Sequence, residues 1–194
     1  LATQSYDPNG GLWDPSGYTV ASGTSFAAPM VAGAAALVKQ KNPNATAAQL
    51  KSLVVNTAVD TIDEYVDGRW IEAPLTSMGA GKLNAADAVK ANVAVNPTTV
   101  SFGVLASSSL PTPVTLEFSN PTSAAVNLAL TVHPFSADSR AQVTLDKSTL
   151  TVGAGQTATV AVKLEGLFPV AGSYEGFIAV AGGESDVGVG IQSV

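Results

Sequence analysis

The hydrophobic pattern of the chain changes its period near Asn92. Before this residue apolar positions recur at helical spacing, and after it they alternate with polar positions over short runs. A change from a period of about 3.6 to a period of 2 indicates two architectures joined in one polypeptide. We therefore predict two domains, residues 1–92 and residues 93–194, with the junction between Ala91 and Asn96.

The first predicted helix covers residues 24–41. It consists of Ala, Val, Leu, Met and other uncharged residues and has no charge before Lys39. A helix that is apolar on every side is typical of a buried core element. We therefore expect this helix to be surrounded by other parts of a domain.

Two further helices are predicted from their start signals. Thr46 and Gln49 have the spacing of a capping box. The apolar stripe that follows consists of Leu50, Leu53, Val54 and Ala58. A short third helix follows a Gly-rich turn, with Asn84 as its N-cap and Asp87 in its first turn. The first part of the chain is thus predicted to be mostly helical.

The second part is predicted to be an all-β sandwich. Its apolar residues alternate with polar ones in runs bounded by turn residues, which is typical of antiparallel strands with one buried face. The runs cover residues 100–104, 114–118, 126–132, 143–145 with 150–152, 158–164, 174–180 and 187–191. About seven strands is the number found in immunoglobulin-like sandwiches. Because this part has about 100 residues, we expect it to fold alone.

Composition narrows the possible partners. Hydrophobic residues make up 46% of the chain and charged residues 12%, which is typical of a globular protein. The net charge of -6 argues against a nucleic-acid partner, because binding to phosphates needs clustered Lys and Arg. No apolar run reaches the roughly 20 residues of a membrane span. With no cysteine, the chain has neither a disulfide framework nor a thiolate metal site.

The main chemical signal surrounds Ser25, at the start of the first predicted helix. A helix N-terminus carries unpaired N–H groups and about half a positive charge, so a nucleophile there attacks where a developing oxyanion is stabilised. Gly23 permits a tight approach into the helix, and Thr24 is predicted to cap it. Pro29 has no N–H, so the Ser25 carbonyl loses its usual partner four residues on.

This segment resembles the nucleophile motif of the subtilase family. The family pattern is Gly-Thr-Ser, a variable residue, a small residue, another variable residue and Pro, and Gly23, Thr24, Ser25, Ala27 and Pro29 match it at every fixed position. Later segments up to residue 92 also resemble the tail of subtilase catalytic domains. The resemblance implies an α/β catalytic domain, of which this chain holds the C-terminal remnant.

The implied activity is that of a serine endopeptidase. Ser25 is implied as the nucleophile, with Gly23, Thr24 and Ser25 as the supporting turn and the Ser25 N–H as an oxyanion-hole donor. Such a peptidase also needs an imidazole and a carboxylate. The family's His and Asp motifs do not occur in this sequence, so we expect them before Leu1 and expect this chain alone to be inactive. The single histidine, His133, is predicted to lie exposed at a strand end, without a catalytic role.

Other candidate ligands and surfaces carry weaker signals. The carboxylates of Asp60, Asp63, Glu64 and Asp67 could bind calcium, but their spacing matches no EF-hand and favours a solvated loop. Two interpretations are open for the aromatic residues Trp13, Tyr65 and Trp70, which are the lining of a substrate cleft and the covering of loops. We assign these residues no role. No cofactor and no metal site is identified.

The resemblance also bears on location and partners. Residues 167–177 resemble the fibronectin-type domains that follow the catalytic domain in large cell-envelope subtilases. This implies a secreted or cell-surface protein that acts on proteins or peptides. Because the first helix is apolar all round, we expect residues 1–92 to self-associate, to retain a cleaved upstream segment or to rearrange. The alternative function is a non-catalytic module whose sandwich binds a partner.

Overall fold

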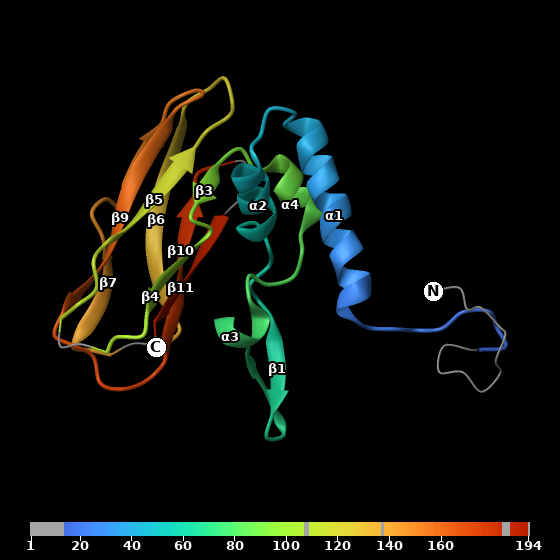
Figure 1. The fold of residues 1–194 in the computed structure, drawn as a ribbon, viewed down its shortest axis with the longest axis horizontal. Coiled ribbons are helices and arrows are strands. Elements are labelled where there is room, and N and C mark those ends of the chain that lie inside the picture. Colours follow the sequence, from blue (N-terminus) through green and yellow to red (C-terminus); the bar gives the residue numbers. More distant parts are fainter. Residues whose placement is uncertain (1–13, 107–108, 137, 184–186, 194) are drawn as a thin grey trace. The chain divides into compact units, whose positions relative to one another are not determined.

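The computed structural model describes residues 14–106, 109–136, 138–183 and 187–193 (Figure 1). The chain divides into two compact units, Leu1–Gly33 and Ala34–Val194. The division falls inside helix α1 (Thr24–Lys41), so the start of this helix belongs to the first unit and its end to the second. Within the described ranges no helix is both long and apolar enough to cross a bilayer.

Helix α1 has the predicted bounds but not the predicted burial. Ala34 and Val38 are its buried residues, whereas Phe26, Met30 and Leu37 are 39%, 66% and 51% exposed. The expectation of a helix surrounded on all sides is therefore wrong for this chain. The physical reason is that within the second unit only short elements, chiefly α2 (Ala47–Val55) and α4 (Ala85–Lys90), pack against its last turns.

The start signals of α2 and α4 are confirmed. At α2 the Thr46 hydroxyl accepts a hydrogen bond from the Gln49 N–H (3.2 Å), and the Gln49 side chain accepts one from the Thr46 N–H (2.9 Å). At α4 the Asn84 side chain accepts from the Asp87 N–H at 3.1 Å. Helix α2 ends at Val55, so the last residue of the predicted stripe lies beyond it.

A β-hairpin between these helices was not predicted. Strands β1 (Asp63–Val66) and β2 (Arg69–Glu72) pair around Asp67 and Gly68, whose φ angles of 49° and 84° suit a two-residue hairpin turn. An Asp-Gly pair between alternating residues is the sequence signal that predicts such a turn. Together with the short helix α3 (Leu75–Met78), helices hold less than half of residues 14–92, so the mostly helical expectation is wrong.

The rest of the chain forms the predicted β-sandwich, with nine strands in the described residues. One sheet has the order β4 (Thr99–Gly103), β11 (Val187–Ser193), β10 (Tyr174–Ala181), β6 (Val126–Pro134) and β8 (Thr149–Val152). The other has the order β3 (Ala94–Asn96), β5 (Val114–Ser119), β9 (Thr157–Gly166) and β7 (Ala141–Leu145). The segments 143–145 and 150–152, which were counted together as one strand, are β7 and β8 and join different sheets. Strand β4 pairs with β11 in parallel rather than antiparallel.

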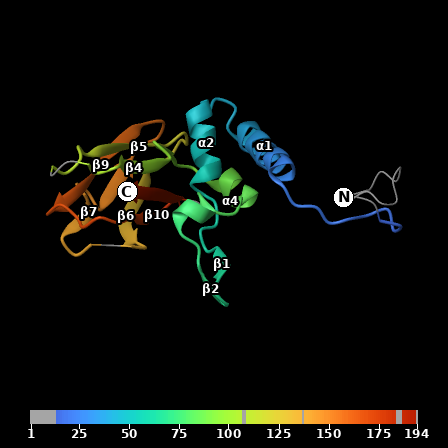
Figure 2. The same ribbon diagram turned by 60° about the horizontal axis from the view of Figure 1, so that its bottom comes forward.

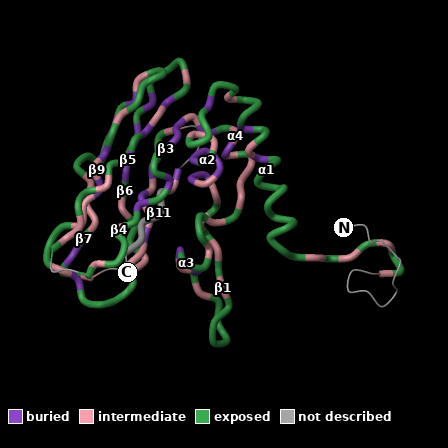
Figure 3. The backbone as a smooth tube through the Cα atoms, viewed as in Figure 1, coloured by how far each residue is buried: buried purple, intermediate pink, exposed green. Residues whose placement is uncertain are grey.

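The core of the sandwich lies between the two sheets (Figure 3). Its fully buried side chains include Leu116, Phe118, Val160, Val162 and Ile178. The buried members of this cluster all lie at residue 93 or later. A core made from one stretch of sequence is compatible with independent folding of residues 93–194, which stays a prediction, as does the domain boundary itself.

A buried polar network joins α2 to the sandwich. The Ser52 hydroxyl accepts from the Val95 N–H (2.7 Å) and donates to the Asn56 side-chain oxygen (2.9 Å). The Asn56 side-chain nitrogen donates to the carbonyl oxygens of Thr98 (2.8 Å) and Gly188 (2.7 Å). The Gly188 N–H in turn donates to the Asn56 carbonyl oxygen at 2.8 Å. Figures 1 and 2 show the resulting placement of α2 beside the sandwich.

Asn56 is the centre of this network. It is 3% exposed, and both hydrogens of its amide nitrogen and its amide oxygen have partners. A buried amide is stable only when its donors and acceptors are satisfied in this way. The helical part and the sandwich are therefore joined by a specific interface and not by a flexible linker alone.

We predict that Asn56→Ala destabilises the chain. The substitution removes the donors to the buried Thr98 carbonyl oxygen and the part-buried Gly188 carbonyl oxygen. It also removes the acceptor of the Ser52 O–H, whose oxygen still accepts from the Val95 N–H, and each buried group that loses its partner costs about 1–3 kcal/mol. We expect the free energy of unfolding to fall by about 3 kcal/mol, measured by urea denaturation of the 194-residue chain. Asn44→Ala, at an exposed position, is the control. Equal effects of the two substitutions would contradict the role of the network.

Candidate active site

Ser25 lies in the first turn of α1. The turn into the helix is closed by the Gly23 carbonyl oxygen, which accepts from the N–H groups of Phe26 (3.0 Å) and Ala27 (3.2 Å). Thr24 is the first helical residue, so Gly23 occupies the position before the helix that was predicted for Thr24. Ser25 is exposed.

The backbone around Ser25 leaves polar groups available. The Ser25 N–H is one of the first N–H groups of the helix, which have no partner within the helix itself. Pro29 lies inside α1, so the Ser25 carbonyl lacks the N–H that would normally donate to it. At a helix start a hydroxyl can attack a carbonyl carbon, and an N–H can stabilise the negative charge that develops on the carbonyl oxygen.

Comparison with known proteins identifies the family. The model of the subtilase family matches residues 3–99, which include Ser25 and its turn. The chain belongs to the subtilase family.

Three subtilase relatives show how much of a longer protein this chain resembles. The minor extracellular protease Vpr of Bacillus subtilis is 31% identical over 175 residues, which are 89% of this chain and 21% of that protein. The alkaline elastase YaB of a Bacillus species is 39% identical over 74 residues (38% and 17%). Subtilisin Savinase of Lederbergia lenta is 56% identical over 41 residues (21% and 15%). The chain thus spans about a fifth or less of these relatives, and its similarity to Vpr extends into the sandwich.

The single histidine of this subtilase chain lies in the sandwich. His133 is exposed near the end of β6, and its ring stacks on Phe177 with the centroids 4.9 Å apart. The prediction of an exposed residue at a strand end is confirmed. No carboxylate of the described residues forms an ion pair with this imidazole.

The acidic stretch lies on and around the β1–β2 hairpin. Asp63 and Glu64 belong to β1, and Asp67 is in the exposed turn. In the described part of the chain no three His, Cys, Asp or Glu side chains are grouped closely enough to hold a metal ion. Tyr65 and Trp70 lie opposite each other on the hairpin, 62% and 70% exposed, with ring centroids 5.2 Å apart. Trp13 lies outside the described residues.

The Gly-rich turn that resembles other subtilases has a clear packing reason. Val59 and Lys82 exchange backbone hydrogen bonds of 2.8 and 2.9 Å, which pin this turn to the chain that follows α2. At Gly81, where φ is 108°, a Cβ atom would lie 2.2 Å from the Val59 carbonyl oxygen. Only glycine fits both the backbone angle and this close approach.

Proposed function

We propose that this chain is part of a serine endopeptidase and that Ser25 is the nucleophile that forms the acyl-enzyme. The observation that carries the proposal is the exposed Ser25 in the first turn of α1, within a motif that matches its family at every fixed position. Membership of the subtilase family supports it. No observation favours the non-catalytic alternative.

The proposed reaction is acyl transfer to Ser25 followed by hydrolysis. The Ser25 hydroxyl attacks the carbonyl of the scissile peptide bond while an imidazole accepts its proton. The Ser25 N–H, held in position by the turn of Gly23 and Thr24, donates a hydrogen bond to the oxyanion of the tetrahedral intermediate. The imidazole then protonates the leaving amine, and water releases the acid product. We propose that this imidazole and its carboxylate come from outside these residues, because His133 is the single histidine.

Protein or peptide chains are the proposed substrates, and the proposed location is outside the cell. One relative, Vpr, is named an extracellular protease, which supports this location. Each step of the proposed reaction uses protein groups and water, so no cofactor is needed. Calcium is not assigned to any residue of this chain.

The first prediction from this proposal concerns Ser25→Ala in the complete enzyme. Loss of the hydroxyl removes the nucleophile, so we expect kcat to fall by about 10⁶-fold, as it does when the nucleophile of subtilisin is removed. Ser22→Ala, at an exposed serine three residues earlier, is the matched control and should leave kcat within about twofold. Substantial turnover by Ser25→Ala would rule out Ser25 as the nucleophile.

The second prediction is that the 194-residue chain alone is inactive. Without a base to accept its proton, the Ser25 hydroxyl is a weak nucleophile. Casein should remain intact, and a fluorophosphonate probe should not label Ser25, as checked by mass spectrometry of the intact chain. The complete enzyme is the positive control. Stoichiometric labelling of Ser25 would show that this chain contains its own base.

The third prediction concerns the apolar surface of α1. Phe26, Met30, Val31 and Leu37 are all more than a third exposed. We propose that these side chains are covered in the complete enzyme and drive self-association of the separate chain. Sedimentation velocity should show concentration-dependent association that Met30→Glu weakens. Gln40→Glu adds the same charge at an exposed polar position of α1 and should leave association unchanged. A strictly monomeric chain would contradict this proposal.

A further inference from the structure

The sandwich has a cavity of about 290 Å³ where the β6–β7 and β9–β10 connections meet. Its apolar wall is formed by Phe102, Val132, Val143 and Leu164, which come from four different strands. These side chains are half-buried, although three of them pack against the main core. The core is thus open to solvent at this cavity. The volume of the cavity is close to the lower limit of ligand-binding pockets, about 300 Å³.

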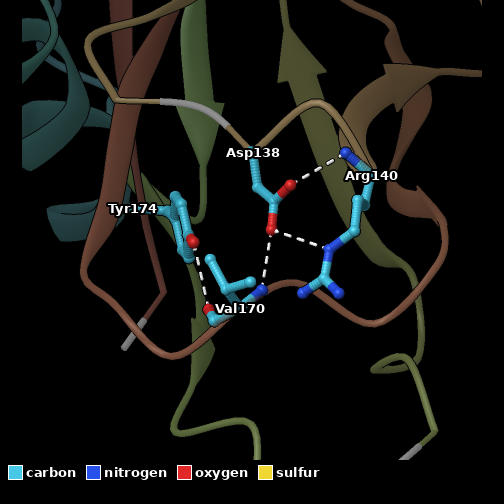
Figure 4. Close-up of polar contacts among 4 residues, drawn as sticks. All are labelled: Asp138, Arg140, Val170 and Tyr174. Carbon is cyan, nitrogen blue, oxygen red and sulfur yellow. Dashed lines mark hydrogen bonds and ion pairs between the residues drawn. The ribbon is translucent and has the colours of Figure 1, made fainter.

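A set of hydrogen bonds holds the rim of this cavity (Figure 4). The Asp138 carboxylate accepts from the Arg140 N–H (2.9 Å), the Arg140 side chain (3.3 Å) and the Val170 N–H (2.7 Å). The Tyr174 hydroxyl donates to the Val170 carbonyl oxygen at 3.0 Å. These bonds tie the two connections together, so the cavity has a preformed opening.

The Asp138 carboxylate at the rim is paired within the protein, and the Glu175 carboxylate, which also lines the cavity, accepts from the Thr76 N–H at 3.3 Å. Hydrogen bonds from the Arg140 and Val170 N–H groups hold the pKa of Asp138 below its usual range, so it is ionised at neutral pH. Its two oxygens are used by the bonds to these residues, and Arg140 also forms an ion pair with it. Asp138 is thus engaged within the protein, and the wall of Phe102, Val132, Val143 and Leu164 favours an apolar group.

Exposed apolar residues lie close in sequence to residues that line the cavity. Leu167 and Val170, both in the β9–β10 connection, are 68% and 55% exposed, and Val104, two residues after Phe102, is 74% exposed. The Leu167 N–H donates to the Arg140 carbonyl oxygen at 2.7 Å, which places this residue beside the rim. Exposed apolar groups around an apolar cavity are typical of an interaction surface.

The wall of the cavity also contains an edge strand. Ala141, Gln142 and Val143 line it in succession, and they belong to β7, the last strand of the four-stranded sheet. β7 pairs with β9 on one side, and no strand in the described ranges pairs with its other side. An edge strand offers alternate N–H and C=O groups to an extended polypeptide, whose side chains can enter an adjacent pocket.

We propose that this end of the sandwich binds an extended polypeptide segment, which pairs with β7 and inserts one bulky aliphatic or aromatic side chain into the cavity. The backbone of the edge strand supplies affinity for any extended chain, and the cavity supplies the preference for a large apolar residue. The site would hold unfolded or flexible protein segments. It lies in the sandwich and requires no chemistry at Ser25, so it goes beyond the proposed peptidase function.

The test is a titration of the methyl- and amide-labelled 194-residue chain, followed by NMR. The probes are two uncharged 12-residue peptides of Ser, Thr and Gly with a single central Leu or Ala. We expect the Leu peptide to shift the methyl signals of Val132, Val143 and Leu164 and the amide signals of β7, with at least tenfold weaker binding of the Ala peptide. Equal binding of the two peptides, or shifts confined to other surfaces, would overturn the proposal.

Two substitutions and a matched control test the position of the site. Val143→Phe fills the cavity and should weaken binding of the Leu peptide at least tenfold, whereas Val114→Phe, half-buried against the same core but outside the cavity, should leave it within twofold. If Val143→Phe does not fold, as judged by thermal unfolding, Ser139→Trp obstructs the rim and should have the same effect. Undiminished binding by the folded variant contradicts the site.

A lipid surface is the competing occupant, and vesicles of phosphatidylcholine test it. We expect these vesicles to leave the methyl signals of the cavity unchanged. Shifts of these signals by vesicles, without a response to the Leu peptide, would overturn the proposal in favour of a lipid site. None of these measurements depends on peptide cleavage, so loss of the Ser25 assignment leaves them interpretable.

Discussion

The arrangement of the second unit depends on one buried amide, the side chain of Asn56. An amide removed from water costs several kcal/mol unless each of its polar atoms finds a partner. Asn56 finds one partner, Ser52, in α2 and two others, Thr98 and Gly188, on segments that are far away in sequence. Only a narrow range of orientations of α2 and the sandwich satisfies all these hydrogen bonds at once. Hydrophobic packing brings α2 and the sandwich together, and the requirements of this amide select a single orientation between them.

This orientation extends to α1. The last turns of α1 share a small apolar cluster with α2 and α4, through Val38, Leu53 and Ala88. Ala94, at the start of β3, belongs to the same cluster, so a residue of the sandwich completes the cluster in which the last turns of α1 pack. Ser25 is in the first turn of this same helix.

The sandwich combines a region of paired polar groups with a largely apolar cavity. Around Asn56 the polar groups of the sandwich and of α2 are paired with each other. At the cavity between the β6–β7 and β9–β10 connections, half-buried side chains of the core meet the solvent under a rim that is held by Asp138. Buried polar pairs give a fixed internal contact, whereas an open apolar cavity leaves free energy available for a ligand.

Local signals in the sequence determined the elements whose cause is local. The capping box at Thr46, the N-cap at Asn84, the bounds of α1 and most strands of the sandwich follow from side chains within one turn or from a period of two. The Ser25 motif was equally readable, because it consists of a few residues in one turn. The signal of the Asp67-Gly68 hairpin is also local, because it is a dipeptide, but the surrounding carboxylates favoured a loop at this place.

Only the tertiary structure decided which elements meet. Nothing near Asn56 in the sequence indicates that its amide contacts Thr98 and Gly188, because the partners lie 42 and 132 residues away. For the same reason the parallel pairing of β4 with β11 and the separation of β7 from β8 could not be read from alternation, which reports one buried face but not the neighbouring strand. The exposure of α1 is also a tertiary property. Apolar side chains favour burial, but the elements that pack against a helix determine how far its side chains are buried.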